Sequence, residues 1–139
     1  MTGKTSDFFV DRLKAWGVTR IYGYSGDGIN GVLGALQRAE KEGNGIEFIQ
    51  VRHEEMAAFM ATAHAKFTGE LGVCLSTGGS GATHLVTGLY DAKLDHVSVL
   101  AIASQAESTV RGANYQQELN LDRLFADVCG YVQEVAAPA

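Results

Sequence analysis

Two turns of the chain combine residue types that could do chemistry. The first turn, residues 52–55, holds an arginine, a histidine and two adjacent glutamates directly after an apolar run. The second turn, residues 76–81, reads STGGSG and precedes a helix-forming segment. A carboxylate such as Glu54 can accept or deliver protons, whereas glycine backbone can approach a ligand closely and offer free N–H donors. The second turn has no lysine after its glycines, so it is not a phosphate-binding P-loop.

Each turn also has an interpretation that involves no ligand. Glu54 and Glu55 at a helix start could simply complement the helix dipole, which favours carboxylates there. The glycines could form a tight turn that binds nothing. The pKa of Glu54 is open as well, because burial would raise it whereas the helix dipole would lower it. From the residues alone, these alternatives stand beside the functional ones.

A third glycine-rich turn, from Gly26 to Gly31, matches the dinucleotide-binding pattern GxGxxG. It follows a short apolar run, and Glu54 stands close to the acidic position that the fingerprint requires. A nicotinamide-binding dehydrogenase domain is therefore an alternative. Two features oppose it: a helix-period segment precedes the strand, and the fingerprint does not need the second glycine turn at 76–81.

The elements that position these turns alternate between strand and helix patterns. We expect strands at residues 20–24, 46–51, 72–75, 97–103 and 130–135. We expect helices at residues 5–16, 28–42, 54–67, 81–94 and 122–126. This alternation predicts a three-layer α/β/α domain with a mostly parallel sheet, in which ligands bind at the carboxyl ends of the strands. The turns at 52–55 and 76–81 should then lie side by side.

Helical spacing also predicts which side chains the helix at 54–67 buries. The apolar residues expected to face inward are Met56, Phe59, Met60, Ala63 and Phe67.

Composition and charge narrow the class of protein. The chain has 139 residues, of which 46% are hydrophobic and 19% charged, and this suits one globular domain. Its net charge of −5 gives no reason to expect binding to nucleic acid or to an anionic membrane surface. No apolar run reaches the length of a membrane span, and we expect no signal peptide. Cys74 and Cys129 form no CxxC pair, so we expect reduced thiols and a cytoplasmic location.

The order of these motifs resembles a known family. Residues 21–135 are similar to the N-terminal, pyrimidine-binding domain of thiamine-diphosphate-dependent enzymes, in particular the pyruvate oxidase and acetolactate synthase branch. The resemblance covers most of the chain, with the motifs in the same order. It is carried by the runs YSGD (24–27), VRHEE (51–55), GVCLS (72–76), GSGATHL (79–85), GLYDA (88–92) and QE (117–118).

The resemblance implies a role for Glu54. The matching glutamate of the family hydrogen-bonds the aminopyrimidine ring of thiamine diphosphate and helps to activate this cofactor, so Glu54 would be the catalytic residue. The implied reaction is decarboxylation of a 2-oxo acid such as pyruvate. The other cofactor-binding positions implied by the match are Ser25, Gly26, Thr77, Ser80, Gly81, His84 and Gln117. None of these residues is expected to bind a metal ion.

The chain departs from the family in two residues and in extent. Ser80 stands where the family usually has proline, and Gln116 stands where an aromatic residue is frequent. The middle domain and the diphosphate-binding domain of the family are absent from residues 1–139, which form a single pyrimidine-binding domain. Mg²⁺ is expected in the absent diphosphate-binding domain, and the use of FAD is open. We therefore expect one excised or separately encoded domain that is inactive alone.

The resemblance also implies partners. Family members place the cofactor between domains of two subunits, so we expect a homodimer or a dimer of dimers. The diphosphate-binding domain of a partner subunit would complete the site. The alternative from another class is a non-catalytic assembly or regulatory module of the same fold, and the presence of Glu54 argues against it.

Overall fold

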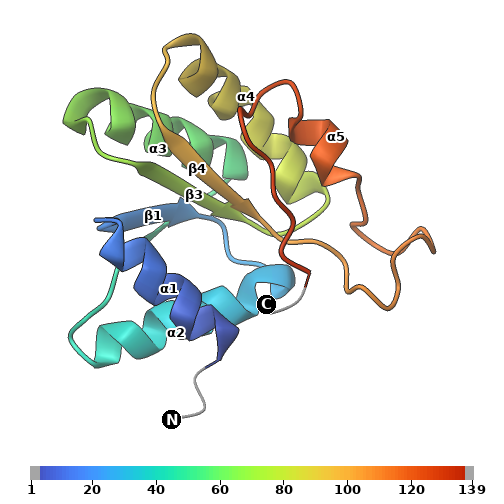
Figure 1. Ribbon diagram of the computed structural model, residues 1–139, viewed down its shortest axis with the longest axis horizontal. Coiled ribbons are helices and arrows are strands. Elements are labelled where there is room, and N and C mark those ends of the chain that lie inside the picture. The colour runs from blue at the N-terminus through green and yellow to red at the C-terminus, as the bar shows by residue number, and fades with distance from the viewer. Residues whose placement is uncertain (1–3, 137–139) are drawn as a thin grey trace.

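The computed structural model describes residues 4–136 and shows a four-stranded sheet with helices on both faces (Figure 1). All strand pairs are parallel, in the spatial order β2-β1-β3-β4. The strands are β1 (Arg20–Gly23), β2 (Glu47–Gln50), β3 (Gly72–Ser76) and β4 (Val99–Ala103). The helices are α1 (Thr5–Ala15), the 3-10 turn η1 (Asp27–Ile29), α2 (Asn30–Lys41), α3 (Glu54–Thr68), α4 (Ser80–Leu94) and α5 (Leu121–Phe125). The predicted α/β class and parallel sheet are confirmed.

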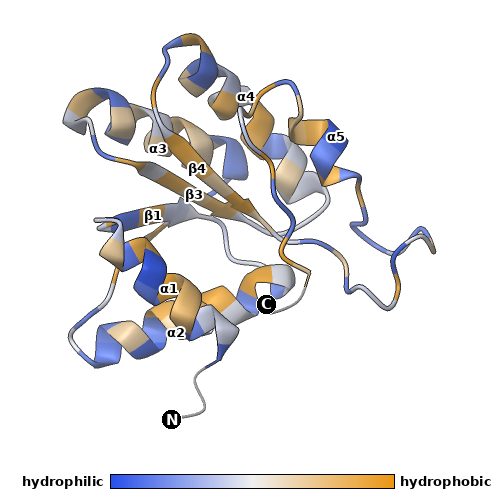
Figure 2. Cartoon of the chain, in the orientation of Figure 1, coloured by the Kyte–Doolittle hydropathy of each residue, from blue (hydrophilic) through white to orange (hydrophobic). Residues whose placement is uncertain are grey.

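The sheet separates two layers of helices and therefore two hydrophobic cores. α1 and α2 lie on one face, and α3 and α4 lie on the other (Figure 1). Because successive residues of a strand point to opposite faces, Val73 and Leu75 of β3 belong to the first core, whereas Cys74 belongs to the second. Figure 2 shows β3 and β4 in hydrophobic colours along their length. Among residues 4–136, none of the helices combines the length and apolar character needed to span a bilayer.

β3 is the most enclosed strand, and all five of its residues are buried. Burial on both faces explains why this strand reads as a continuous run of small and apolar residues instead of an alternating one. The same burial raises the pKa of the Cys74 thiol to about 12, because an apolar surrounding disfavours the thiolate. Cys74 therefore behaves as a packed, unreactive side chain, and its thiol forms no disulfide.

α3 buries small residues where its periodicity predicted large ones. Met56 is 51% exposed and Phe67 is 89% exposed, so the predicted inward stripe is wrong at both of these positions. The residues of α3 that are buried after Glu54 are Ala57, Ala58, Ala61, Thr62 and Ala65. The physical reason is that α3 packs against both the sheet and α4, where a large side chain has no room.

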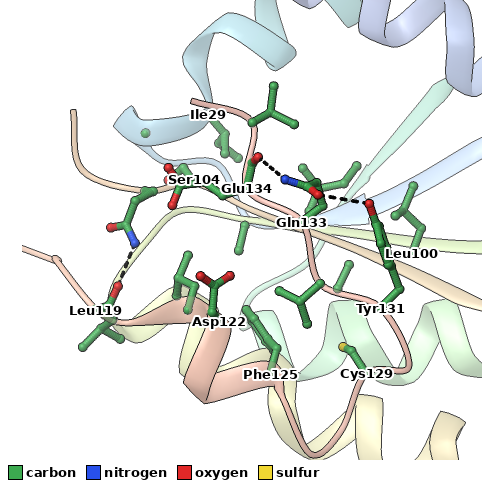
Figure 3. A pocket seen from close by; sticks show the side chains of 18 of the residues that line it. Ile29, Leu100, Ser104, Leu119, Asp122, Phe125, Cys129, Tyr131, Gln133 and Glu134 are labelled. Atoms are coloured by element: carbon green, nitrogen blue, oxygen red, sulfur yellow. Dashed lines mark hydrogen bonds between the residues drawn. The ribbon is translucent and has the colours of Figure 1, made fainter. Parts of the chain in front are cut away.

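The strand predicted at residues 130–135 is absent from the sheet. In the described part of the chain, this segment forms neither helix nor strand and pairs with no strand of the sheet. It runs beside β4 and, together with α5, bounds a hollow of about 1500 Å³ along the outer edge of the sheet (Figure 3). Two of its hydrogen bonds stay within the segment: the Tyr131 hydroxyl donates to the side-chain oxygen of Gln133, and the side-chain amide of Gln133 donates to the backbone carbonyl of Glu134. The strand predicted here therefore lacks, among the described residues, the hydrogen-bonded neighbour that a sheet requires.

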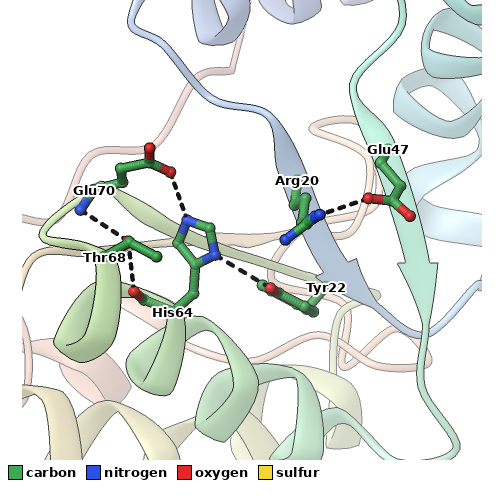
Figure 4. A network of polar contacts seen from close by, with 6 residues as sticks. All are labelled: Arg20, Tyr22, Glu47, His64, Thr68 and Glu70. Carbon is green, nitrogen blue, oxygen red and sulfur yellow. Dashed lines mark hydrogen bonds and ion pairs between the residues drawn. The ribbon is translucent and has the colours of Figure 1, made fainter.

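A polar network fastens α3 to β1 (Figure 4). The Tyr22 hydroxyl on β1 lies 3.3 Å from Nδ1 of His64 on α3, and Nε2 of His64 lies 3.1 Å from Oε2 of Glu70. The side chain of His64 is only 9% exposed, so both ring nitrogens need these partners. The network thus helps to hold in place the helix that begins at Glu54.

Candidate active site

The turns that follow β2 and β3 meet at the carboxyl end of the sheet. β2 leads into α3, which begins at Glu54, and β3 leads into α4, which begins at Ser80. Nδ1 of His84 on α4 lies 2.9 Å from Oε2 of Glu54. An ideal Cβ on Gly81 would lie 3.3 Å from Oε1 of the same carboxylate. The side-by-side placement expected for the two turns is therefore observed.

Small residues determine how closely His84 approaches Glu54. α3 and α4 follow β2 and β3, which lie on either side of β1, and the two helices pack against each other in steps of about one helical turn. One turn after the contact between Glu54 and His84, an ideal Cβ on Gly88 would come within 2.6 Å of the Cβ of Ala58. One turn further, the Thr62 hydroxyl donates to the carbonyl oxygen of Gly88 at 3.0 Å. The absence of side-chain bulk at Gly88 therefore lets the two helices bring the site residues together.

His53 caps the start of α3, and the two glutamates that follow it differ in exposure. Its backbone is extended, and its Nδ1 accepts a hydrogen bond from the Glu55 amide at 3.3 Å, which caps the helix. The side chain of Glu54 is 11% exposed, whereas that of Glu55 is 43% exposed. The interpretation as a simple complement to the helix dipole therefore suits Glu55, and Glu54 is the carboxylate enclosed in the site.

Opposing effects set the pKa of Glu54. Burial raises the pKa, because an apolar surrounding disfavours the charged carboxylate. The hydrogen bond from His84, a backbone N–H bond and the nearby charge of His84 and His53 lower it, and together they outweigh burial. The pKa of Glu54 therefore lies below its ordinary value, and the group is ionised at neutral pH. Because an ionised carboxylate only accepts, Nδ1 of His84 carries the hydrogen and donates it.

The glycines of the turn after β3 permit close packing by a distant loop. Gly79 has a φ of 63°, and an ideal Cβ there would lie 2.7 Å from the Cβ of Gln117. An ideal Cβ on Gly78 would lie 2.9 Å from the carbonyl oxygen of Ser104. α4 starts without a side-chain cap, so the N–H groups of its first turn have no side-chain acceptor. Gln117, one of the residues predicted to bind the cofactor, thus packs against the glycine turn.

The loop after β1 packs on the same glycine turn. An ideal Cβ on Gly26 would lie 2.8 Å from the Cβ of Thr77, so glycine permits this contact. Ser25 is exposed and faces a shallow hollow between α2 and β2. Ser80 is also exposed, and within residues 4–136 no hydrogen bond joins either serine to Glu54. Neither serine therefore belongs to the group beside the carboxylate, which includes His84 and Gly81.

His53 belongs to this site although sequence reasoning assigned it no role. Its ring lies against that of His84, with centroids 4.3 Å apart and an angle of 31° between the planes. The sequence did contain a signal for this contact. The turn at 52–55 contains His53, and His84 follows the turn at 76–81 by three residues. Two such histidines had to come close once the turns were side by side.

Comparison with known proteins identifies the family to which this chain belongs. Residues 3–124 match the family model described as "Thiamine pyrophosphate enzyme, N-terminal TPP binding domain". The chain belongs to this family. Thiamine pyrophosphate is another name for thiamine diphosphate, so the resemblance inferred from the motifs is confirmed. The glycine-rich loop after β1 therefore belongs to a domain of this family, and its GxGxxG pattern does not require a dinucleotide-binding fold.

Relatives of this family member are much longer proteins. The chain is 50% identical over 123 residues to YdaP of Bacillus subtilis, a protein named for thiamine pyrophosphate, and 48% identical over 119 residues to pyruvate oxidase of Lactiplantibacillus plantarum. It is 40% identical over 116 residues to the large subunit of acetolactate synthase isozyme 2 of Escherichia coli. These matches cover 88%, 86% and 84% of the chain, but 21%, 19% and 20% of the relatives. The chain thus spans about a fifth of the length of these relatives.

Proposed function

We propose that this chain is the pyrimidine-binding domain of a larger thiamine-diphosphate-dependent enzyme that decarboxylates a 2-oxo acid such as pyruvate. The observation that carries the proposal is the ionised carboxylate of Glu54, buried at the carboxyl end of the sheet and bonded to His84. Family membership implies the cofactor. The pyruvate oxidase and acetolactate synthase among the relatives support the substrate class.

The residues around Glu54 fit the pyrimidine part of the cofactor. A buried, ionised carboxylate is an acceptor for a protonated ring nitrogen or an amino group. Glycine at position 81 leaves space beside Oε1 of Glu54, because even a methyl group there would come within 3.3 Å of this atom. The residues proposed to bind the cofactor together with Glu54 are Ser25, Gly26, Thr77, Ser80, Gly81, His84 and Gln117.

The side chains of this site would exchange a proton with the cofactor and hold the reacting carboxylate in position. When bound, thiamine diphosphate supplies the carbon nucleophile that attacks the 2-oxo acid and accepts the electrons released with carbon dioxide. Glu54 would exchange a proton with the pyrimidine ring as a general acid and base, and its lowered pKa leaves it ready to accept. His84 bonds Oε2 and thereby directs Oε1, so we assign His84 a positioning role.

The remaining contacts to the cofactor would come from outside this chain. We propose that a diphosphate-binding domain of a partner subunit holds the diphosphate and Mg²⁺ in a homodimer or a dimer of dimers. Met56, exposed on α3 two residues after Glu54, offers apolar surface for that association. The chain by itself is then expected to be inactive and to bind thiamine diphosphate weakly, because the charged diphosphate would lack most of its partners.

Replacement of Glu54 by glutamine in the complete enzyme tests the proposal. Glutamine has nearly the same shape as glutamate but cannot exchange a proton with the ring nitrogen. We expect Glu54→Gln to slow hydrogen–deuterium exchange at C2 of the thiazolium ring by about 10²–10⁴-fold, the usual range for general acid–base catalysis. The matched control is Glu55→Gln, whose side chain is more exposed and which should change the rate little.

Melting temperatures of both variants separate a proton-transfer defect from a folding defect. An unchanged exchange rate in Glu54→Gln would exclude Glu54 from the mechanism and would favour the non-catalytic module of the same fold. Equal slowing by Glu54→Gln and Glu55→Gln would show that the wrong carboxylate was chosen. Titration with NADH tests the dehydrogenase alternative, for which we expect no saturable binding.

A further inference from the structure

Three side chains that can ligate a metal ion meet at the start of α3. His53 and Glu54 come from α3 and the residue before it, and His84 comes from α4. Each offers one ligand atom, and these three atoms all lie within 4.8 Å of one another. The carboxylate is already 2.9 Å from one of the two histidines, whose rings lie against each other. The cluster is therefore assembled by the fold from turns about 30 residues apart.

The donor types in this cluster suit a transition-metal ion. Imidazole nitrogen is a preferred ligand of Zn²⁺, Cu²⁺ and Ni²⁺, whereas Mg²⁺ prefers oxygen ligands in a strict octahedron. Two imidazoles and one carboxylate leave a fourth position for water, as in open zinc sites. A tetrahedral Zn²⁺ with bonds of about 2.0–2.1 Å holds its ligand atoms about 3.3 Å apart. Closing the cluster to that distance requires rotation of the two histidine side chains.

Exposure and charge favour the entry of a cation. The side chains of His53 and His84 are 47% and 40% exposed, so they can rotate and solvent can reach them, while buried Glu54 supplies a fixed charge. Oε2 of Glu55 lies 3.9 Å from Nδ1 of His53 and adds a second negative charge. Within residues 4–136, no lysine or arginine forms an ion pair with either glutamate. An arriving cation would therefore meet two carboxylates that no lysine or arginine of the described residues neutralises through an ion pair.

In contrast to the expectation from the sequence that none of the cofactor-binding residues ligates a metal, we propose that His53, Glu54 and His84 form a binding site for one Zn²⁺ ion or a similar transition-metal ion. The ion takes one nitrogen from each histidine and one carboxylate oxygen, and it replaces the direct hydrogen bond between Glu54 and His84. Because the same carboxylate is assigned to the pyrimidine ring, bound metal would compete with thiamine diphosphate. This competition rests on the proposed function, whereas the metal site itself does not.

Calorimetric titration of the 139-residue chain with Zn²⁺ tests the site. We expect one Zn²⁺ to bind per chain, with no saturable binding of Mg²⁺ under the same conditions. His53→Ser, which keeps a side chain able to cap α3, and His84→Ala should each weaken Zn²⁺ binding about 10-fold or more, because even the loss of an outer partner costs a metal site 10–100-fold. His96→Asn is the control, since this exposed histidine follows α4 with a φ of 55°, which asparagine tolerates.

Nuclear magnetic resonance of the unaltered chain gives a reading that needs no variant. Addition of Zn²⁺ should shift the ring resonances of His53 and His84 and leave those of His96 in place. Absence of saturable Zn²⁺ binding would overturn the proposal. Binding that survives both His53→Ser and His84→Ala, or that His96→Asn weakens equally, would also overturn it, because the ion would then lie elsewhere.

The competition with the cofactor has its own test in the complete enzyme. Zn²⁺ added beside saturating Mg²⁺ should slow the exchange at thiazolium C2, and excess thiamine diphosphate should relieve the slowing. Slowing that thiamine diphosphate does not relieve would contradict competition for Glu54. Failure of the Zn²⁺ titration leaves the result with Glu54→Gln untouched, so the metal site and the proposed function stand or fall separately.

Discussion

Gly88 lies where α4 crosses α3, and its replacement by alanine tests how the site is positioned. An ideal Cβ on Gly88 would lie 2.6 Å from the Cβ of Ala58 and 2.7 Å from both the carbonyl carbon of Ala58 and the amide nitrogen of Phe59. Two of these atoms are backbone, which cannot move aside as a flexible side chain could. Gly88→Ala must therefore push the helices apart, one turn away from the contact between Glu54 and His84.

The size of the effect follows from two opposing contributions. Overpacking of a close-packed interior typically costs 1–3 kcal/mol, and contact with backbone places Gly88→Ala near about 3 kcal/mol. Alanine is favoured over glycine in a helix by about 1 kcal/mol, so the net loss should be about 2 kcal/mol. At roughly 4 °C per kcal/mol for a chain of this size, the melting temperature should fall by about 8 °C.

Gly31→Ala in α2 provides the matched control. It makes the same chemical change in a helix, but the nearest atom to an ideal Cβ at Gly31 is the Cβ of Ser6, at 3.9 Å. This substitution should stabilise the chain by about 0.4–1 kcal/mol. Urea unfolding of both variants measures the difference. If Gly88→Ala is as stable as Gly31→Ala, small residues do not control the approach of α3 to α4, and the reasoning is refuted.

Other predictions concern pH and association. The raised pKa of Cys74 means that its contribution to stability is complete below pH 9 and is lost as pH rises toward 12, by up to about 1.4 kcal/mol per pH unit. Urea unfolding should show a flatter alkaline dependence in Cys74→Ala, and an equal dependence would contradict the prediction. The lowered pKa of Glu54 means that its contribution is present above its ordinary pKa and is lost as pH falls through the folded value, so Glu54→Gln should reduce acid sensitivity in the same measurement. Sedimentation should show self-association that Met56→Ser weakens and Phe8→Ser, altered on the opposite helix layer, does not; equal weakening would move the interface away from α3.

Local patterns were enough to predict the architecture. The alternation of strand and helix patterns predicted a parallel sheet covered on both faces, and four of the five expected strands are present. The turns after β2 and β3 were expected to meet, because parallel strands place their carboxyl ends at one edge. The motif order also predicted the family, which the comparison confirms. These properties depend on residue type and spacing along the chain, which are visible in the sequence.

Contacts between distant segments determined what the patterns could not. Periodicity placed Met56 and Phe67 inward, but both are exposed, and the face of α3 that packs against α4 and the sheet carries small residues instead. A strand was also predicted at residues 130–135, yet strand formation needs a hydrogen-bonding partner, and this segment lies beside β4 without pairing.

The charge of Glu54 is the property for which tertiary structure mattered most. The sequence determined that a glutamate stands at the end of a buried strand and the start of a helix, with burial and the helix dipole opposed. It could not decide between them, because the hydrogen bond that lowers the pKa comes from His84, a residue brought within 2.9 Å by the packing of α4 on α3. A hydrogen bond acts over a few ångströms in space, whereas the sequence records only separation along the chain.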